Sequence, residues 1–316
     1  MEQVLGQPVN WINARKPVSW SDIGVPVPRL FMQSGWSYPA FSALGREVKL
    51  AGGQVVGLSD ANWRGDFRQL LLGPLAFRLR YRRHFDAFLV PGRQGERLMR
   101  HFGMPPNLIR TGMYGADPSL FSPGRPLNER PREFLFVGQL IHRKDILGLT
   151  SAFAEFSRQR PGWTLRICGS GELRKQIPEH SQIVVEDFVQ PHELASRYSS
   201  ARFLVLPSLV EAWGLVVHEA SLCGCGLILS SAVGSGDDLA SERNSIRFRA
   251  GKKPELLAAL LSAADQNSEW LIQAGSESIA RARNFGPERF ATEISRLVSE
   301  FGGYSTSASL QFQPVG

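Results

Sequence analysis

The chain has few cysteines and lacks the long apolar runs that mark a membrane span. Its 316 residues include only Cys168, Cys223 and Cys225, an odd number in strand-like or helix-end positions. We therefore expect reduced structural thiols rather than a disulfide framework. No apolar run approaches the ~20 residues that a spanning helix needs, and residues 1–6 carry no signal-peptide pattern. These absences predict a cytoplasmic protein.

Metal motifs are absent as well. Cys223 and Cys225 lie near His218, but no fourth ligand follows and the C-x2-C spacing of zinc sites is missing. We therefore expect no metal. The sequence also has no zinc finger, RNA-recognition signature or Lys-rich tail, which argues against nucleic acid as a partner.

The charge balance is basic, with a formal net charge of +7 and an isoelectric point near 9.7. Such a surface attracts anions, including anionic lipids and diphosphates. Within the helix-like residues 70–84, Leu, Phe and Tyr alternate with Arg78, Arg80, Arg82 and Arg83. Two interpretations stay open. The stretch is either a solvated helix face packed on a sheet, which the pattern favours slightly, or a peripheral contact with the anionic inner face of a membrane.

Strand-like and helix-like segments alternate along the chain in two series, which predicts parallel sheets with helices on both faces. Residues 123–132 separate the two series and are rich in proline and charge, which is typical of a linker. The expected strands are residues 29–33, 54–58, 86–91 and 108–111 before the linker, and 134–137, 164–168, 182–185, 203–206, 227–229 and 246–248 after it.

This pattern predicts four regions. Residues 1–125 form a shortened Rossmann-like first domain, and residues 126–286 form a complete Rossmann-like second domain. Residues 287–301 form a helix that packs back on the first domain. The Ser-, Gly- and Gln-rich residues 302–316 form a flexible tail.

A pair of glutamates marks the strongest candidate site. A short apolar strand runs into Pro207 and Ser208, and the loop that follows carries Glu211. Gly214 then opens a helix, with Glu219 about one turn inside it. A helix N-terminus suits a diphosphate, a carboxylate one turn inside suits a ribose diol, and the loop carboxylate suits sugar hydroxyls. The alternative is an ordinary strand–helix unit with surface acids.

Two cations follow the first strand of the second series. Gly138 allows a sharp turn, and Arg143 and Lys144 come soon after it, where they can stabilise a leaving diphosphate. The alternative is a solvated basic pair, which the helix dipole disfavours at a helix start. His142 and His218 are titratable neighbours that fit a structural role equally well.

The motif Pro-Ser…Glu-x-Trp-Gly-Leu…Glu-Ala, followed by Cys-Gly-Cys-Gly, resembles retaining glycosyltransferases of the GT-B fold, in particular glycosyltransferase family 4, the group 1 glycosyl transferases. The resemblance covers about residues 54–300. It implies an α/β fold of two Rossmann-like, doubly wound domains that face a cleft. It also implies transfer of a hexose from a UDP-, GDP- or ADP-linked sugar to a glycan or lipid-linked acceptor, as in polysaccharide or glycolipid assembly. The chain lacks the D-x-D clamp of the other large glycosyltransferase fold, so no metal or cofactor is expected.

Carried over to this chain, the family pattern assigns Glu211, Arg143 and Lys144 to catalysis. Phe188 and Val189 are expected to border the nucleobase, although a core phenylalanine fits the pattern about as well. The full set of expected donor-binding residues is Gly138, Gly169, Gly171, Phe188, Val189, Ala212, Trp213, Gly214, Leu215 and Glu219.

The chain departs from the family pattern at several positions. Gln139 stands where an arginine is frequent, Asp145 where a glycine is frequent, and Asn244-Ser245 where Asn-Gly is commoner. The Gly-Gly loop that follows the family's first strand is not found. Either the first domain is shortened, or the natural start lies upstream of Met1.

The first domain is expected to hold the acceptor, through Trp36, Asp60 and Asn62. Trp36 suits stacking on a sugar but equally suits a core, and Asp117 is assigned to a turn. Two rival functions stay open. One is a glycosyltransferase-like binding or scaffold protein with little or no turnover, which the missing loop motivates. The other is a non-hydrolysing sugar-nucleotide epimerase on the same fold.

Overall fold

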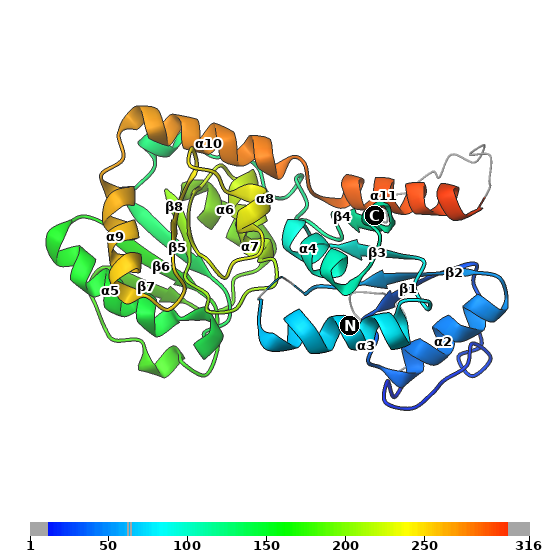
Figure 1. The fold of residues 1–316 in the computed structure, drawn as a ribbon. Coiled ribbons are helices and arrows are strands. Elements are labelled where there is room, and N and C mark those ends of the chain that lie inside the picture. The colour runs from blue at the N-terminus through cyan, green and yellow to red at the C-terminus, as the bar shows by residue number, and fades with distance from the viewer. Residues whose placement is uncertain (1–11, 62, 64, 303–316) are drawn as a thin grey trace.

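The computed structural model describes residues 12–302 apart from residues 62 and 64. It has two α/β units side by side, each built on its own parallel sheet (Figure 1). The ten strands that the structure describes lie within one or two residues of the ten expected ones. The expected flexible tail at 302–316 falls, after its first residue, outside the described residues.

The first unit holds a four-stranded sheet in the order β1-β2-β3-β4, all parallel. The strands are β1 (Leu30–Ser34), β2 (Gln54–Leu58), β3 (Ala87–Val90) and β4 (Ile109–Thr111). Sequential order with right-handed crossovers puts the connecting helices on one face. These are α2 (Pro39–Leu50), the run η1–α3–η2 (Arg68–Leu72, Gly73–Ala76, Phe77–Tyr81) and α4 (Arg93–Phe102).

The two faces of the first sheet are covered by different parts of the chain. Because neighbouring strand residues point to opposite faces, Val55 packs under the connecting helices and Val56 faces the other way. There Val56, Ala87 and Leu89 pack against Leu297 of α11 (Pro287–Gly302). Figure 1 shows α10 over the second unit continuing into α11 over the first. The last helix thus closes the face that the crossovers leave open.

The expected helix over residues 70–84 has an irregular geometry. Two π-helical stretches, Arg68–Leu72 and Phe77–Tyr81, flank four α-helical residues. Pro74 has no N–H to donate to the carbonyl of Leu70, which is the cost of proline inside a helix. His101 Nε2 lies 3.0 Å from that carbonyl oxygen and satisfies it instead.

The second unit holds a six-stranded parallel sheet in the order β10-β9-β8-β5-β6-β7. The strands are β5 (Glu133–Val137), β6 (Thr164–Cys168), β7 (Ile183–Glu186), β8 (Phe203–Leu206), β9 (Gly226–Ser230) and β10 (Ser245–Phe248). The helices are α5 (Ile146–Gln159), α6 (Pro191–Ser200), α7 (Leu215–Leu222), α8 (Gly236–Leu239), α9 (Lys253–Ala264) and α10 (Ser268–Ala282).

This strand order is the doubly wound arrangement of dinucleotide-binding folds, and it reverses between β5 and β8. Ligands in such sheets bind beyond the carboxyl ends of the strands at that switch point. The fold therefore predicts a ligand site at the loops after β5 and β8.

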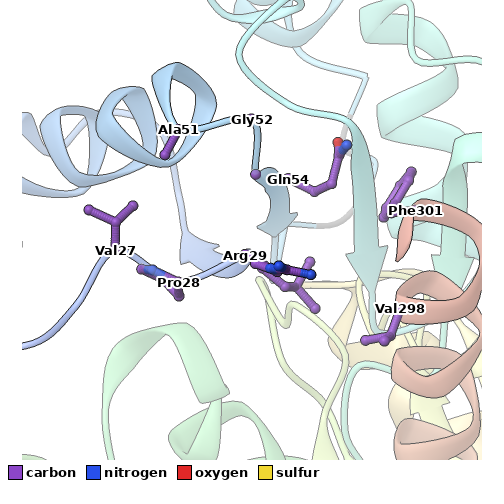
Figure 2. Close-up of a pocket in the computed structure, with 10 residues that line it drawn as sticks. Val27, Pro28, Arg29, Ala51, Gly52, Gln54, Val298 and Phe301 are labelled. Carbon is purple, nitrogen blue, oxygen red and sulfur yellow. The ribbon is translucent and has the colours of Figure 1, made fainter. Parts of the chain in front are cut away.

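One cavity lies at the edge of the first sheet where the strands begin, which is opposite to the edge where such sheets bind ligands. Its volume is about 430 Å³, and it opens where β1 and β2 begin. Val298 and Phe301 of α11 line one side, and the residues before and at the start of β1 and β2 line the rest (Figure 2). Because it lies at the amino ends of the strands, we do not take it as the candidate site. Among the described residues, no helix is long and apolar enough to cross a membrane.

Candidate active site

The switch point brings together the two loops that carry the expected catalytic residues. The loop after β5 carries Arg143 and Lys144, and the loop after β8 carries Glu211. A backbone hydrogen bond ties the loops, because Leu209 N donates to the carbonyl oxygen of Arg143 at 2.8 Å. Residues 67 positions apart in sequence therefore meet at one edge of the sheet.

Glu211 lies at the centre of a charged cluster. The ammonium group of Lys144 pairs with its carboxylate, and Ser208 Oγ donates to Glu211 Oε2 at 3.1 Å. The guanidinium of Arg143 lies 3.8 Å from Oε1. Glu211 and Lys144 are each only 7% exposed. A charge buried to this extent is tolerated when it is paired and hydrogen-bonded. The charge of Lys144 therefore stabilises the buried carboxylate of Glu211, and that carboxylate stabilises the buried ammonium group of Lys144.

A cavity of about 270 Å³ adjoins this cluster at the boundary between the units. The second unit lines it with Glu211 and with the loop Ser231–Gly234 after β9, and the first unit contributes Trp63 and Gln94. The expected cleft between two domains is therefore present, with Glu211 in its wall. Trp63 and Gln94 were not predicted. Gln94 follows closely on the carboxyl end of β3, which was the signal that could have revealed it.

Asp60, which was expected on the acceptor side, follows β2 and lies close enough to Glu211 to be affected by its charge. Tyr114 Oη donates a hydrogen bond to Asp60 Oδ1 at 2.5 Å. Asp60 as a whole residue is exposed, yet loss of solvent around its carboxyl group raises its pKa. The hydrogen bond from Tyr114 lowers this pKa, and the nearby negative charge of Glu211 raises it further. The charge of Glu211 in the second unit therefore acts on Asp60 in the first.

Neither Asp60 nor Trp36 is among the residues that line this cavity. Asn62 lies outside the described residues. The ring of Trp36 packs edge-on against Phe77, Phe88 and Phe102, at centroid distances of 5.5, 6.0 and 6.1 Å. This packing is that of the core alternative, and Trp36 borders a different cavity on the helix side of the first unit.

Helix α7 presents its N-terminus as the sequence suggested. Gly214 stands at its start with φ of 90°, a conformation that glycine adopts without strain, and no side chain caps the helix. Ala212 is partly exposed and Leu215 is exposed beside it. Glu219 is half-buried and accepts a hydrogen bond from Tyr198 Oη at 2.7 Å. Burial raises the pKa of Glu219, and the bond from Tyr198 opposes that shift.

The predicted donor-binding glycines serve a close approach of two loops. Gly138, Gly169 and Gly171 have φ of 152°, 154° and 156°. A Cβ on Gly169 would lie 1.9 Å from the carbonyl oxygen of Gly138, and one on Gly171 would lie 2.5 Å from that of Leu140. Only glycine lets these backbones interlock beyond β5 and β6. After β7, Phe188 is 69% exposed, which rules out the core alternative, while Val189 packs partly against the main core.

Trp213, expected to contact the donor, instead joins the two units. It is buried, and its indole N–H donates to Asp238 Oδ2 at 3.0 Å. Its ring meets Tyr114 edge-on with centroids 5.5 Å apart. Asp238 also accepts from the backbone N–H of Arg93 at 3.1 Å, at the start of α4. A carboxylate is stabilised at a helix N-terminus, so this contact clasps the first unit to the second.

His218 lies in the same joint and has a structural role. The backbone N–H of Ala116 donates to its Nδ1 at 2.8 Å, and its Nε2 lies 2.9 Å from the carbonyl oxygen of Ala282. A carbonyl only accepts, so Nε2 carries the proton and the ring is neutral. Burial lowers the pKa of His218 accordingly. Both ring nitrogens are used, which leaves no role for His218 as a ligand beside Cys223 and Cys225.

The three cysteines are buried and form no disulfide. Burial raises the pKa of Cys225 to about 11 and that of Cys168 to about 12, as expected for inert structural thiols. Across the described part of the chain, His, Cys, Asp and Glu side chains do not gather in groups of three or more that could hold an ion.

Solved structures of other proteins share this architecture. Sucrose-phosphate synthase from Thermosynechococcus elongatus aligns over 90% of this chain and 76% of its own, with a TM-score of 0.67 and 20% identity. HepE from Anabaena in complex with UDP aligns over 85% of this chain and 79% of its own, with a TM-score of 0.69 and 15% identity. The chain therefore has the GT-B fold, and its four-stranded first sheet fits the expected shortened first domain.

Comparison of the amino-acid sequence adds a match to a family model and to individual relatives. Residues 121–269, most of them in the second unit, match the model of the family described as "Glycosyl transferases group 1". D-inositol 3-phosphate glycosyltransferase from Corynebacterium efficiens is 30% identical over 227 residues, or 64% of this chain and 53% of the relative. Glycogen synthase from Mycobacterium tuberculosis is 31% identical over 142 residues, or 43% of this chain and 34% of the relative. The chain spans about half the length of the first of these relatives.

The joint at His218 predicts a loss of stability in acid. Its pKa is lowered by folding from an ordinary value of about 6.5. The unfolded chain therefore binds more protons below about pH 6.5, and the free energy of unfolding falls as pH drops through that value. His84, whose pKa is also lowered by burial, adds to the slope. We expect His218→Gln to remove up to about 1.4 kcal/mol per pH unit of this dependence.

Thermal midpoints measured between about pH 5 and 8 test this expectation. The matched control is His192→Gln, because His192 is exposed and lies outside the joint. An equal acid slope in wild type and His218→Gln would show that His218 is not neutral in the folded protein.

Proposed function

We propose that this chain is a retaining, metal-independent glycosyltransferase that moves a hexose from a nucleotide-diphospho sugar to a glycan or lipid-linked acceptor. The observation that carries the proposal is the Lys144–Glu211 pair, which lies at the switch point of the second sheet and borders a cavity between the two units. The family match of residues 121–269 supports it. So do fold neighbours that are complexes with UDP, with UDP and glucose, and with UDP and GlcNAc.

The donor lies, in this proposal, along the carboxyl ends of β5 to β8. Its diphosphate sits at the N-terminus of α7, where helix N–H groups and the dipole favour anions. Glu219 one turn inside binds the ribose, and the exposed Phe188 after β7 borders the base. UDP, GDP and ADP donors all fit this description.

The chemistry follows from the charges at the cluster. As the diphosphate leaves, the anomeric carbon gains oxocarbenium character. Arg143 and Lys144 stabilise the leaving charge without a divalent ion. Glu211 accepts hydrogen bonds from sugar hydroxyls alongside those from Lys144 and Ser208, since a carboxylate accepts several at once. The acceptor attacks from the face that the diphosphate leaves, which retains the anomeric configuration.

Asp60 of the first unit, whose pKa is raised in part by the charge of Glu211, is the proposed partner of the acceptor hydroxyl. Its raised pKa suits a group that exchanges a proton nearer to neutral pH than an ordinary aspartate does. Tyr114 orients it through their hydrogen bond.

A second candidate is a scaffold protein that binds a nucleotide sugar with little or no turnover. The four-stranded first sheet favours it, since a shorter wall offers fewer contacts to the donor. Turnover by the purified chain separates the two candidates.

Loss of the charged cluster is expected to abolish transfer. We predict that Glu211→Gln and Lys144→Met each lower donor turnover by about 100-fold or more, because each removes a preorganised charge from the reacting centre. Donor hydrolysis and transfer are measured with UDP-, GDP- and ADP-glucose in excess EDTA.

The matched controls are Glu193→Gln and Lys175→Ala, both at exposed positions outside the cluster, and they should keep full activity. Circular dichroism confirms folding, since breaking a buried pair costs roughly 3–5 kcal/mol. Unchanged turnover in either folded cluster variant would contradict the site assignment. Turnover that stops in EDTA would contradict metal independence.

The proposed role of Asp60 predicts a particular pH profile. If the carboxylate form is active, the rate rises with pH through the pKa of Asp60, which lies above its ordinary value. Tyr114→Phe removes the hydrogen bond that lowers this pKa, so the acid limb should move to still higher pH. Asp60→Asn should remove the limb altogether.

The pH dependence of kcat/KM for each variant measures this shift. Tyr38→Phe, at an exposed tyrosine of the same unit, is the control and should keep the wild-type profile. An acid limb at the same pH in wild type and Tyr114→Phe would exclude Asp60 as the group that titrates.

A further inference from the structure

One segment of the first unit exposes an unusual number of apolar side chains. Six of the seventeen large apolar side chains that are exposed in the described part of the chain lie between residues 67 and 79. Leu79 is 79% exposed, and Leu71, Leu75 and Leu79 recur at intervals of four, so they project from one side of the helix. The six are Phe67, Leu70, Leu71, Leu72, Leu75 and Leu79.

The helix is held firmly by its other side, so this exposure is built into the fold. Pro74 and Phe77 are buried, and Phe77 packs in the core of the first unit. The guanidinium of Arg78 donates to the carbonyl oxygens of His101 and Phe102 at the end of α4, at 3.1 and 3.3 Å. The apolar side is therefore presented to solvent by a well-anchored helix.

Cations flank the apolar side chains. In the part of the chain that the structure describes, no ion pair neutralises Arg78, Arg80, Arg82 or Arg83. Near the C-terminal end of the helix, Arg80 and Arg46 line a cavity of about 390 Å³. The six exposed apolar side chains and Arg78, Arg80, Arg82 and Arg83 thus form a surface that is both apolar and positively charged, and we name it the leucine–arginine face.

This combination fits one kind of partner best. An anionic bilayer takes apolar side chains into its acyl boundary and attracts arginines to its headgroups. A second copy of the chain fits poorly, because a symmetric dimer would set the same arginines against each other. A nucleic acid would leave the leucines exposed.

One end of the leucine–arginine face is close in sequence to a residue that lines the cleft. Phe67 lies four residues after Trp63, which lines the cavity beside Glu211. Figure 1 shows this helix, which carries the label α3, running from the side of the second unit along the first. A bilayer on this face would therefore meet the mouth of the cleft.

We infer that the leucine–arginine face docks on an anionic lipid bilayer and presents the cleft to a lipid-linked acceptor. The docking stands on its own, whereas the acceptor class rests on the proposed function.

Vesicle sedimentation of the full chain tests the docking without any turnover. The chain should bind vesicles of phosphatidylcholine with phosphatidylserine far better than vesicles of phosphatidylcholine alone, and salt should weaken the binding. Arg80→Gln with Arg83→Gln should reduce binding about fivefold per arginine. Leu75→Gln with Leu79→Gln should reduce it about tenfold or more. The matched control is Leu50→Gln, since Leu50 is 82% exposed but lies at the end of α2.

Donor hydrolysis, measured on the same samples, separates the two proposals. The four substitutions lie outside the charged cluster, so they should leave hydrolysis unchanged. Hydrolysis without vesicle binding would overturn the docking and leave the proposed function standing. Vesicle binding without any turnover would support the docking and contradict the proposed function. Binding that is equal in the leucine variants, or self-association that these variants abolish, would overturn the docking.

Discussion

The site depends on one buried ion pair between loops that are far apart in sequence. Lys144 and Glu211 are both nearly inaccessible to solvent, and neither charge would be tolerated there without the other. Their meeting is a consequence of topology, because β5 and β8 are neighbours only where the strand order reverses. The backbone bond from Leu209 to Arg143 fixes the two loops in register. The α7 N-terminus, which follows the second loop, is thereby positioned as well.

The contacts that join the two units set the width of the cleft. In the second unit, Trp213 packs on Tyr114 of the first unit. His218 accepts a hydrogen bond from the backbone of Ala116, and Asp238 accepts one from the start of α4. Tyr114 connects this joint to Asp60, because its ring packs on Trp213 and its hydroxyl donates a hydrogen bond to Asp60. The joint therefore couples the relative placement of the units to the proposed acceptor residue. It also offers a physical reason why a first sheet of only four strands can still form a wall of the site.

Much of this could be predicted from the sequence because local rules determine it. Alternating apolar segments predicted the strands, and Gly103, with φ of 99°, ends α4 in the left-handed conformation that glycine commonly adopts at a helix end. The departure at Asp145 is explained by its φ of 52°, a conformation that glycine adopts most easily and aspartate tolerates. Long-range pairing was beyond such rules. The sequence assigned Lys144 and Glu211 to separate parts of the donor but could not show their contact, and it could not tell Trp213 at a joint from Trp213 at a ligand.

Binding of the donor is the most direct test of the account. The thermal midpoint of the wild-type chain is measured with UDP-, GDP- and ADP-glucose in EDTA, alongside the double variant Lys144→Met/Glu211→Leu, which leaves no lone buried charge. The account predicts that at least one donor stabilises the wild type, by about 2.7 kcal/mol at 100 times its dissociation constant, and that the double variant loses this stabilisation. A midpoint that no donor raises, or an equal rise in the double variant, would contradict a donor site at the switch point.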